Sequence, residues 1–150
     1  MKSKLQLNQE MSSLDSVTVT AFCYVLECES RSDLEQALPC SYYIGSTSNT
    51  NMRIAQHFSG RGSKFTRANH PIRLAEIDVQ PRLTAGEVLA FENETTMRYM
   101  LQMIRDHGPD AWRAVCGGSW CKLDQNMPGE LRRRLTDLPD ATQPEDSQGR

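Results

Sequence analysis

The sequence predicts an α/β fold, in which a small, mainly antiparallel sheet of three strands is flanked by helices. Segments with strand character occur at residues 17–28, 41–45 and 72–79. A helical pattern covers residues 84–107, and a shorter helix is expected from about Asn51. The chain has 150 residues, of which 38% are hydrophobic and 24% charged, so we expect it to bury one core and form one domain.

The first strand, 17–28, is rich in β-branched and aromatic residues and is apolar on both alternating faces, which fits a strand in the middle of a sheet. The second ends at Gly45. The third is entered through Pro71 and ends before Pro81. Between the first two strands, residues 29–39 are acidic and turn-like, and either a mobile flap or a short helix would fit them.

The short helix carries two polar residues of interest. Asn49 or Asn51 caps its start, and Arg53 and His57 lie four residues apart, which places both side chains on one face at the edge of a cleft. A Gly-flanked basic loop is expected to follow.

The long helix places a carboxylate on an apolar face. Thr84 and Glu87 form a capping box at its start, and Gly108-Pro109 ends it. Glu92 falls near the centre of an apolar stripe, and burying an unpaired carboxylate costs several kcal/mol. Either a cation such as Arg53 therefore opposes Glu92, or the helix approaches a solvated cleft. The stripe consists of Ala85, Val88, Leu89, Thr96, Tyr99 and Met103.

Domain limits follow from the polar ends of the chain. Residues 1–16 are expected to form a flexible arm, 17–138 a single domain and 139–150 a disordered tail. There is neither an apolar run long enough for a membrane span nor the pattern of a signal peptide, so we expect a cytoplasmic or nucleoid-associated protein.

An extension of the domain begins near residue 108. In it, Trp112 and Trp120 are expected to pack a turn back on the core, although a base-stacking role is the alternative. A short basic helix is expected at 129–138.

The five cysteines have irregular spacings, which argues against a secreted disulfide framework and favours reduced thiols over a zinc site. They are Cys23, Cys28, Cys40, Cys116 and Cys121.

Positive charge is concentrated in the middle of the chain, whose net charge is -2. Neither Asp nor Glu occurs between Gln36 and Ala75, although five cations fall there, which predicts a polyanionic partner. The cations are Arg53, Arg61, Lys64, Arg67 and Arg73.

Five elements in one order resemble a GIY-YIG nuclease domain over roughly residues 18–107. They are the strand AFCYVLEC, the triplet Tyr43-Ile44-Gly45, the R-x-x-x-H helix, the G-S-K-F-T loop and a glutamate on a later helix. The phrasing A-x-C-Y-x-L and R-x-x-Q-H is most similar to the structure-specific junction endonucleases, without their zinc-binding RING domain. Phe22-Cys23-Tyr24 stands where the family has Gly-Ile-Tyr, so the reactive tyrosine is kept.

The resemblance implies a metal-dependent endonuclease that hydrolyses phosphodiester bonds in DNA. Tyr24 would be the general base, with His57 bonded to it or relaying its proton, while Tyr43 orients water or phosphate and Arg53 stabilises the transition state. Glu92 would hold a divalent cation, Mg²⁺ first and Mn²⁺ as the alternative, because hard ions often use one or two carboxylates. Contacts to the nucleic-acid backbone are expected from Arg61, Lys64, Thr66, Arg67 and Arg73.

A free tyrosine is a poor base at neutral pH. With a reference pKa of about 10, about one in a thousand is ionised at pH 7, a deficit of roughly 4 kcal/mol that Arg53, a metal or His57 must offset.

Two alternatives stay open: a non-catalytic nucleic-acid-binding module, and a nuclease subunit active only with a protein partner or as a homodimer. The sequence does not show whether the DNA substrate is duplex, branched or single-stranded.

Overall fold

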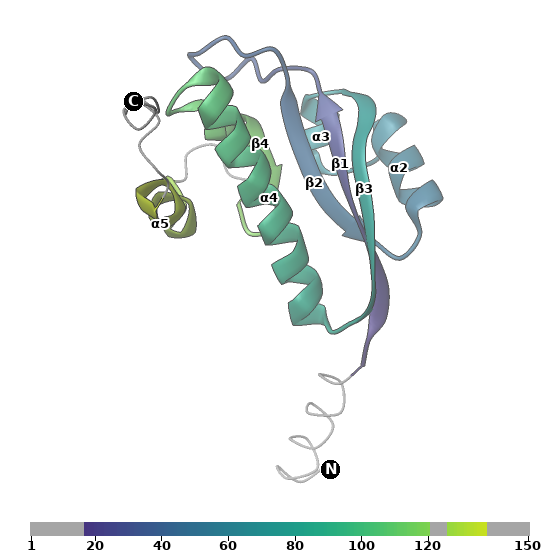
Figure 1. Ribbon diagram of the computed structural model, residues 1–150. Coiled ribbons are helices and arrows are strands. Elements are labelled where there is room, and N and C mark those ends of the chain that lie inside the picture. Colours follow the sequence, from purple (N-terminus) through teal and green to yellow (C-terminus); the bar gives the residue numbers. More distant parts are fainter. Residues whose placement is uncertain (1–16, 121–125, 138–150) are drawn as a thin grey trace, which may run out of the picture.

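The computed structural model describes residues 17–120 and 126–137. A four-stranded sheet has the order β3 (Pro71–Leu83), β1 (Val19–Cys28), β2 (Ser41–Thr47) and β4 (Val115–Gly117). The long helix α4 (Ala85–His107) lies on one face of the sheet, and the short helices α2 (Thr50–Phe58) and α3 (Lys64–Ala68) lie on the other (Figure 1). The α/β class is confirmed, although the sheet has four strands where three were expected. The arm at 1–16 and the tail at 139–150 lie outside the described residues. Within the described ranges, none of the helices combines the length and apolar character needed to cross a membrane.

The central strand is β1 (Val19–Cys28), which pairs antiparallel with both β2 (Ser41–Thr47) and β3 (Pro71–Leu83). Cys23 and Val25 pack into the core under α4, whereas Tyr24 and Leu26 pack on the opposite face, which confirms the prediction of a strand buried on both sides. Tyr24 pairs directly with Gly45. The two tyrosine motifs are therefore in register despite the long connection between their strands.

The fourth strand arises from a segment that the sequence analysis treated as a turn. The 3₁₀ helix η1 (Ala111–Ala114) buries Trp112, and β4 (Val115–Gly117) then runs parallel to β2. This pairing ends at Ile44. Beyond that point, none of the described strands pairs with the outer edge of β2; this unpaired edge, from Gly45 onward, is here called the open edge.

Helix α4 (Ala85–His107) begins with the predicted capping box, but its buried face differs from the predicted stripe. Leu89, expected in the core, is 45% exposed. The reason is that β2 ends opposite Phe22, so near the start of α4 the sheet narrows to β1 and β3 and offers little surface to pack on. The buried residues of the helix are Thr95, Thr96, Met97, Met100 and Met103.

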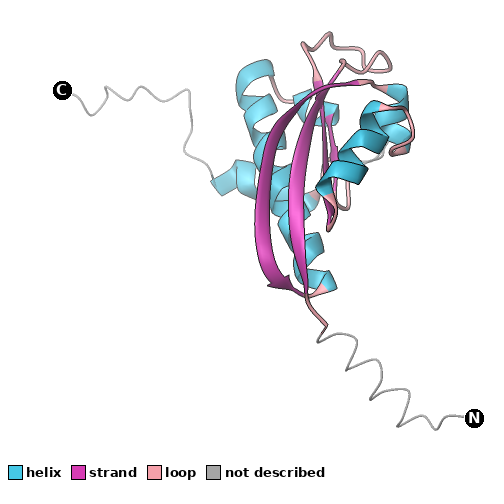
Figure 2. Cartoon of the chain, turned by 90° about the vertical axis from the view of Figure 1, so that its right-hand side faces the viewer, coloured by secondary structure: helices cyan, strands magenta, loops and turns pink. Residues whose placement is uncertain are grey.

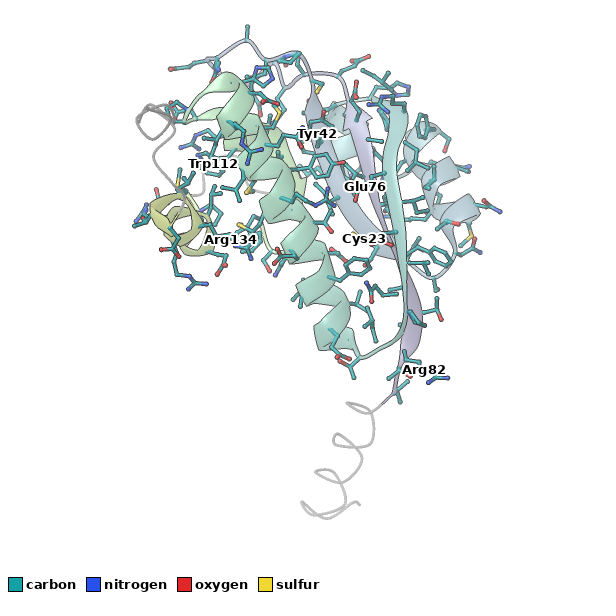
Figure 3. All side chains as sticks on the ribbon, viewed as in Figure 1. Cys23, Tyr42, Glu76, Arg82, Trp112 and Arg134 are labelled. Carbon is teal, nitrogen blue, oxygen red and sulfur yellow. The ribbon has the colours of Figure 1, made fainter. Side chains whose placement is uncertain are left out.

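Polar contacts hold α4 to its neighbours. Tyr42 and Glu76 lie between the sheet and the helix (Figure 3), where the Tyr42 ring is 4.9 Å from that of Tyr99 and the Tyr99 hydroxyl donates to Glu76 at 2.8 Å. The basic helix predicted at 129–138 is α5 (Gly129–Asp137), whose Arg134 forms an ion pair with Glu94 of α4 at 2.7 Å.

Residues 29–39 form turns and bends without a helix, and specific contacts hold them in place. Arg31 donates to the Arg113 carbonyl at 3.2 Å, pairs with Asp33 at 3.1 Å and lies over the Phe65 ring at 5.2 Å. Leu38 is buried in the main core. This connection therefore packs as part of the domain and is not a free flap.

The expectation of reduced thiols is correct for Cys23, Cys28 and Cys40, which are free and buried. Burial raises the pKa of the Cys23 thiol to about 11, so this thiol is protonated at neutral pH. Cys116, in contrast, is disulfide-bonded, which corrects the expectation for that residue. Cys121 lies outside the described residues.

Strand β3 lies at one end of the strand order and is longer than the predicted 72–79. Figure 2 shows it as a long, curved ribbon. Its pairing with β1 is interrupted by three register shifts. Four of its apolar side chains are exposed: Ile72, Leu74, Ile77 and Val79.

Two alanine substitutions on α4 test which face of the helix is buried. We expect Met100→Ala to lower the free energy of unfolding by about 2–5 kcal/mol, because its fully buried side chain would leave a cavity. Leu89→Ala is the control and should change it by less than about 0.5 kcal/mol. Urea denaturation measures both, and equal losses would contradict the observed burial.

Candidate active site

Helix α2 (Thr50–Phe58) positions Arg53 and His57. Of the two candidate caps, Asn49 is the one used, and its side chain accepts from the Met52 amide at 3.2 Å. The helix turns His57 into the protein, where it is 0% exposed, while Arg53 is half-buried. His57 is thus inside the protein, deeper than the expected cleft edge.

A chain of hydrogen bonds links three side chains from β1, α2 and α3. The Tyr24 hydroxyl is 2.7 Å from Nε2 of His57, and Nδ1 of His57 is 2.8 Å from Oγ1 of Thr66. Two glycines allow this close packing. A Cβ at Gly45 would lie 2.6 Å from the Tyr24 hydroxyl, and a Cβ at Gly62 would lie 2.2 Å from Nδ1 of His57.

Tyr43 completes an aromatic cluster with this chain. Its ring centroid is 6.3 Å from that of Tyr24 and 5.0 Å from that of His57. On its other side, Tyr43 stacks on Phe65 with centroids 6.1 Å apart. The structure therefore brings together both tyrosines that the sequence analysis proposed.

Burial keeps both His57 and Tyr24 uncharged at neutral pH. Burial, and after it the Arg53 charge, lowers the pKa of His57 to about 4, so the imidazole is neutral at pH 7. Burial, followed by the neighbouring Tyr43, raises the pKa of Tyr24, although the charge and hydrogen bond of Arg53 act in the opposite direction. Tyr24 is therefore a protonated phenol beside a neutral imidazole that can take its proton.

Glu92 projects from α4 toward β2 and is half-buried. Its Oε2 accepts a hydrogen bond from the Ser46 hydroxyl, directly after the Tyr43-Ile44-Gly45 triplet. In the part of the chain that is described, Glu92 forms no ion pair, and Arg53 donates to Gln56 at 3.0 Å instead. The alternative of a structural salt bridge between Glu92 and Arg53 is therefore not what the structure shows.

The side chains of Glu92 and Tyr24 lie on opposite faces of the sheet. Ser46 pairs with Cys23 on the α4 side, whereas Tyr24 packs on the side of α2 and α3. Gly45, which pairs with Tyr24, and Ser46, which bonds Glu92, are neighbours on β2 beyond Ile44. The negative charge of Glu92 is also one cause that raises the pKa of Tyr24.

The donor set fits a hydrated hard cation and not a closed metal cage. Among residues 17–120 and 126–137, no group of three or more His, Cys, Asp or Glu could hold a metal ion. Ser46 is the one described hydrogen-bond donor to the Glu92 carboxylate and uses Oε2, so Oε1 is available to a ligand. One carboxylate, with water and substrate oxygens, is a common arrangement for Mg²⁺.

The expected basic loop contains a short helix, α3 (Lys64–Ala68), capped by Ser63. Three cations are exposed on and beside it, and none of them forms an ion pair within the described ranges; they are Arg61, Lys64 and Arg67, here called the α3 cations. Two other predicted contacts are placed elsewhere. Thr66 is 1% exposed and bonds His57, while Arg73 pairs with Glu27 at 2.9 Å on the α4 side of the sheet.

Comparison with known proteins identifies the family of the chain. Residues 20–102, more than half of the chain, match the model of the GIY-YIG catalytic domain. The chain belongs to the GIY-YIG family. This is a family of nucleases, which bind nucleic acid and generally use divalent metals, and the predicted resemblance is confirmed at the level of the family.

Relatives of this GIY-YIG chain are UPF0213 proteins. One from Streptococcus pneumoniae is 44% identical over 54 residues, which cover 36% of this chain and 46% of that protein. The chain thus spans about half the length of this relative. A UPF0213 protein of Streptococcus agalactiae is 28% identical over 92 residues, 61% of this chain and 94% of that protein. No solved structure matches.

Two site features were not found from the sequence of this GIY-YIG domain. The first is the contact of Ser46 with Glu92. The sequence offered one signal for it, the hydroxyl residue directly after the Tyr43-Ile44-Gly45 triplet. Nothing in the sequence indicated that Thr66 would point inward, because its neighbours Lys64 and Arg67 point to solvent.

A pH titration tests the buried imidazole. In the folded protein, the NMR signal of His57 should stay that of a neutral ring until the pH approaches 4, because burial opposes protonation. Since the unfolded chain takes up this proton near pH 6.5, the contribution of His57 to stability should be complete above pH 6.5 and decrease as the pH falls toward 4. The spectrum of His57→Gln assigns the signal. Protonation of His57 near pH 6.5 in the folded protein would contradict the prediction.

Proposed function

We propose that this GIY-YIG domain is a divalent-metal-dependent endonuclease that hydrolyses phosphodiester bonds in DNA. The observation that carries the proposal is the buried contact of 2.7 Å between the Tyr24 hydroxyl and the neutral His57 ring. A binding module has no need for such a pair, whereas hydrolysis needs a group that removes a proton from water.

In the proposed reaction, the Tyr24 oxygen accepts a proton from the attacking water while the Tyr24 proton passes to Nε2 of His57. This route removes the need for a preformed phenolate, which the raised pKa of Tyr24 disfavours. Tyr43, in contact with both rings, orients water or phosphate. Arg53, half-buried beside Tyr24, offsets negative charge on the phosphoryl oxygens in the transition state.

Glu92 and Ser46 are the residues that would hold a cation at the open edge of β2, with Mg²⁺ as the proposed ion and Mn²⁺ as its substitute. A bound cation supplies positive charge that stabilises the leaving oxygen. The α3 cations bind the phosphate backbone without reading sequence.

The direct test incubates the pure protein with labelled duplex, branched and single-stranded DNA, with Mg²⁺ and with excess EDTA. Cleavage that requires the metal supports the proposal. Binding without cleavage of any of these DNAs would favour the non-catalytic module or the subunit that needs a partner, and undiminished cleavage in EDTA would remove the metal from the mechanism.

Glu92→Gln should abolish cleavage while DNA affinity stays the same or rises slightly. The amide keeps the shape and can still accept from Ser46, but it loses the charge that attracts a cation. Melting temperature, DNA affinity and Mg²⁺-dependent cleavage are measured on one preparation.

Glu94→Gln on the same helix is the matched control, because Glu94 pairs with Arg134 away from the site, and it should still cleave. A Glu92→Gln variant that cuts at a substantial fraction of the wild-type rate would refute the metal role of Glu92.

The double substitution Lys64→Ala and Arg67→Ala should weaken DNA binding on all sequences. It should also reduce the slope of log affinity against log salt by up to about two units, because a protein that makes fewer phosphate contacts releases fewer counterions when it binds. The control pair is Arg105→Ala and Arg132→Ala, two exposed cations outside the α3 surface. If both pairs change the slope equally, the α3 cations do not form the binding surface.

A further inference from the structure

Thr66 is buried at the end of the hydrogen-bond chain, where the proposed reaction has not yet used it. Its Oγ1 is 2.8 Å from Nδ1 of His57 and 3.3 Å from the Ser63 carbonyl oxygen. The side chain is fixed by α3, because the Thr66 amide donates to the Ser63 side chain at the helix start. A Thr66 hydroxyl held in this way can bond His57 in one of two directions.

The Tyr24 end of the chain favours one of these two directions. The Tyr24 side chain is 1% exposed, so its hydroxyl proton needs an acceptor inside the protein. Nε2 of His57, at 2.7 Å, is the acceptor that the described residues offer. Nε2 must therefore be without a proton.

The remaining bonds follow in order. With Nε2 bare, the neutral His57 ring carries its proton on Nδ1 and donates it to Oγ1 of Thr66. The Thr66 hydroxyl in turn donates to Ser63, whose carbonyl oxygen lies at 3.3 Å and whose hydroxyl oxygen lies at 3.2 Å. The reverse direction would place a proton on Nε2 and leave the buried Tyr24 hydroxyl without an acceptor, at a cost of about 1–3 kcal/mol.

We propose that Thr66 is a positioning residue that holds His57 in the Nδ1–H tautomer, so that Nε2 is free to receive the Tyr24 proton. This inference rests on the proposed function for its catalytic meaning, but the tautomer itself does not depend on activity. It replaces the expected role of Thr66 at a phosphate.

The experiment compares the wild type with Thr66→Val, which has a similar shape without the hydroxyl, and with Thr66→Ser, which restores the hydroxyl. Long-range ¹⁵N–¹H spectra of ¹⁵N-histidine-labelled protein at neutral pH distinguish a protonated from a bare ring nitrogen, and His57→Gln assigns the signals. We expect Nδ1–H in the wild type and in Thr66→Ser, and the Nε2–H form or a mixture in Thr66→Val.

An Nε2–H ring in the wild type would overturn the inference, even if Thr66→Val fails to fold. Retention of the pure Nδ1–H form in a folded Thr66→Val protein would overturn it as well. If the protein cleaves DNA, Thr66→Val should lower kcat by about 10–100-fold with little change in KM, by analogy with the partners that orient metal-ligating histidines, and Thr66→Ser should recover most of it. A changed DNA affinity with an unchanged tautomer would return Thr66 to a binding role.

If neither the wild type nor the variants cleave DNA, the proposed function fails, but the spectra still decide the role of Thr66.

Discussion

The site depends on one constraint, the burial of the Tyr24–His57 hydrogen bond within a small protein. The same burial keeps the imidazole neutral and the phenol protonated, so that a proton can move between them. It also dictates the surroundings. Gly45 and Gly62 are needed because any side chain there would collide with the Tyr24 hydroxyl or the His57 ring.

A second constraint is the short length of β4. Because its pairing ends at Ile44, the next part of β2 keeps an open edge, to which Tyr24 and Glu92 contribute from opposite faces of the sheet. Ser46 links the two sides, since it belongs to β2 and bonds the carboxylate from α4. The sheet therefore separates the proton-transfer groups from the carboxylate, although the negative charge of Glu92 still raises the pKa of Tyr24.

The local order of the elements could be predicted from the sequence, because capping and strand patterns are short-range signals. The capping box of α4 and the central position of β1 are examples. Long-range packing was not predictable in the same way. The exposure of Leu89 depends on where β2 ends, and the inward orientation of Thr66 depends on where α3 meets α2. The catalytic candidates were found through the sequence motif. The role of Ser46, in contrast, can be seen only once the packing of α4 against β2 is known.

The irregular pairing of β3 has a consequence for the behaviour of the protein in solution. A long strand at the end of a sheet, with Ile72, Leu74, Ile77 and Val79 exposed, is the kind of surface that recruits further strands and leads to aggregation. Its three register shifts bend the strand and disturb the regular spacing that an added strand would need. The same register shifts that interrupt the pairing thus make this edge a poor template for an added strand.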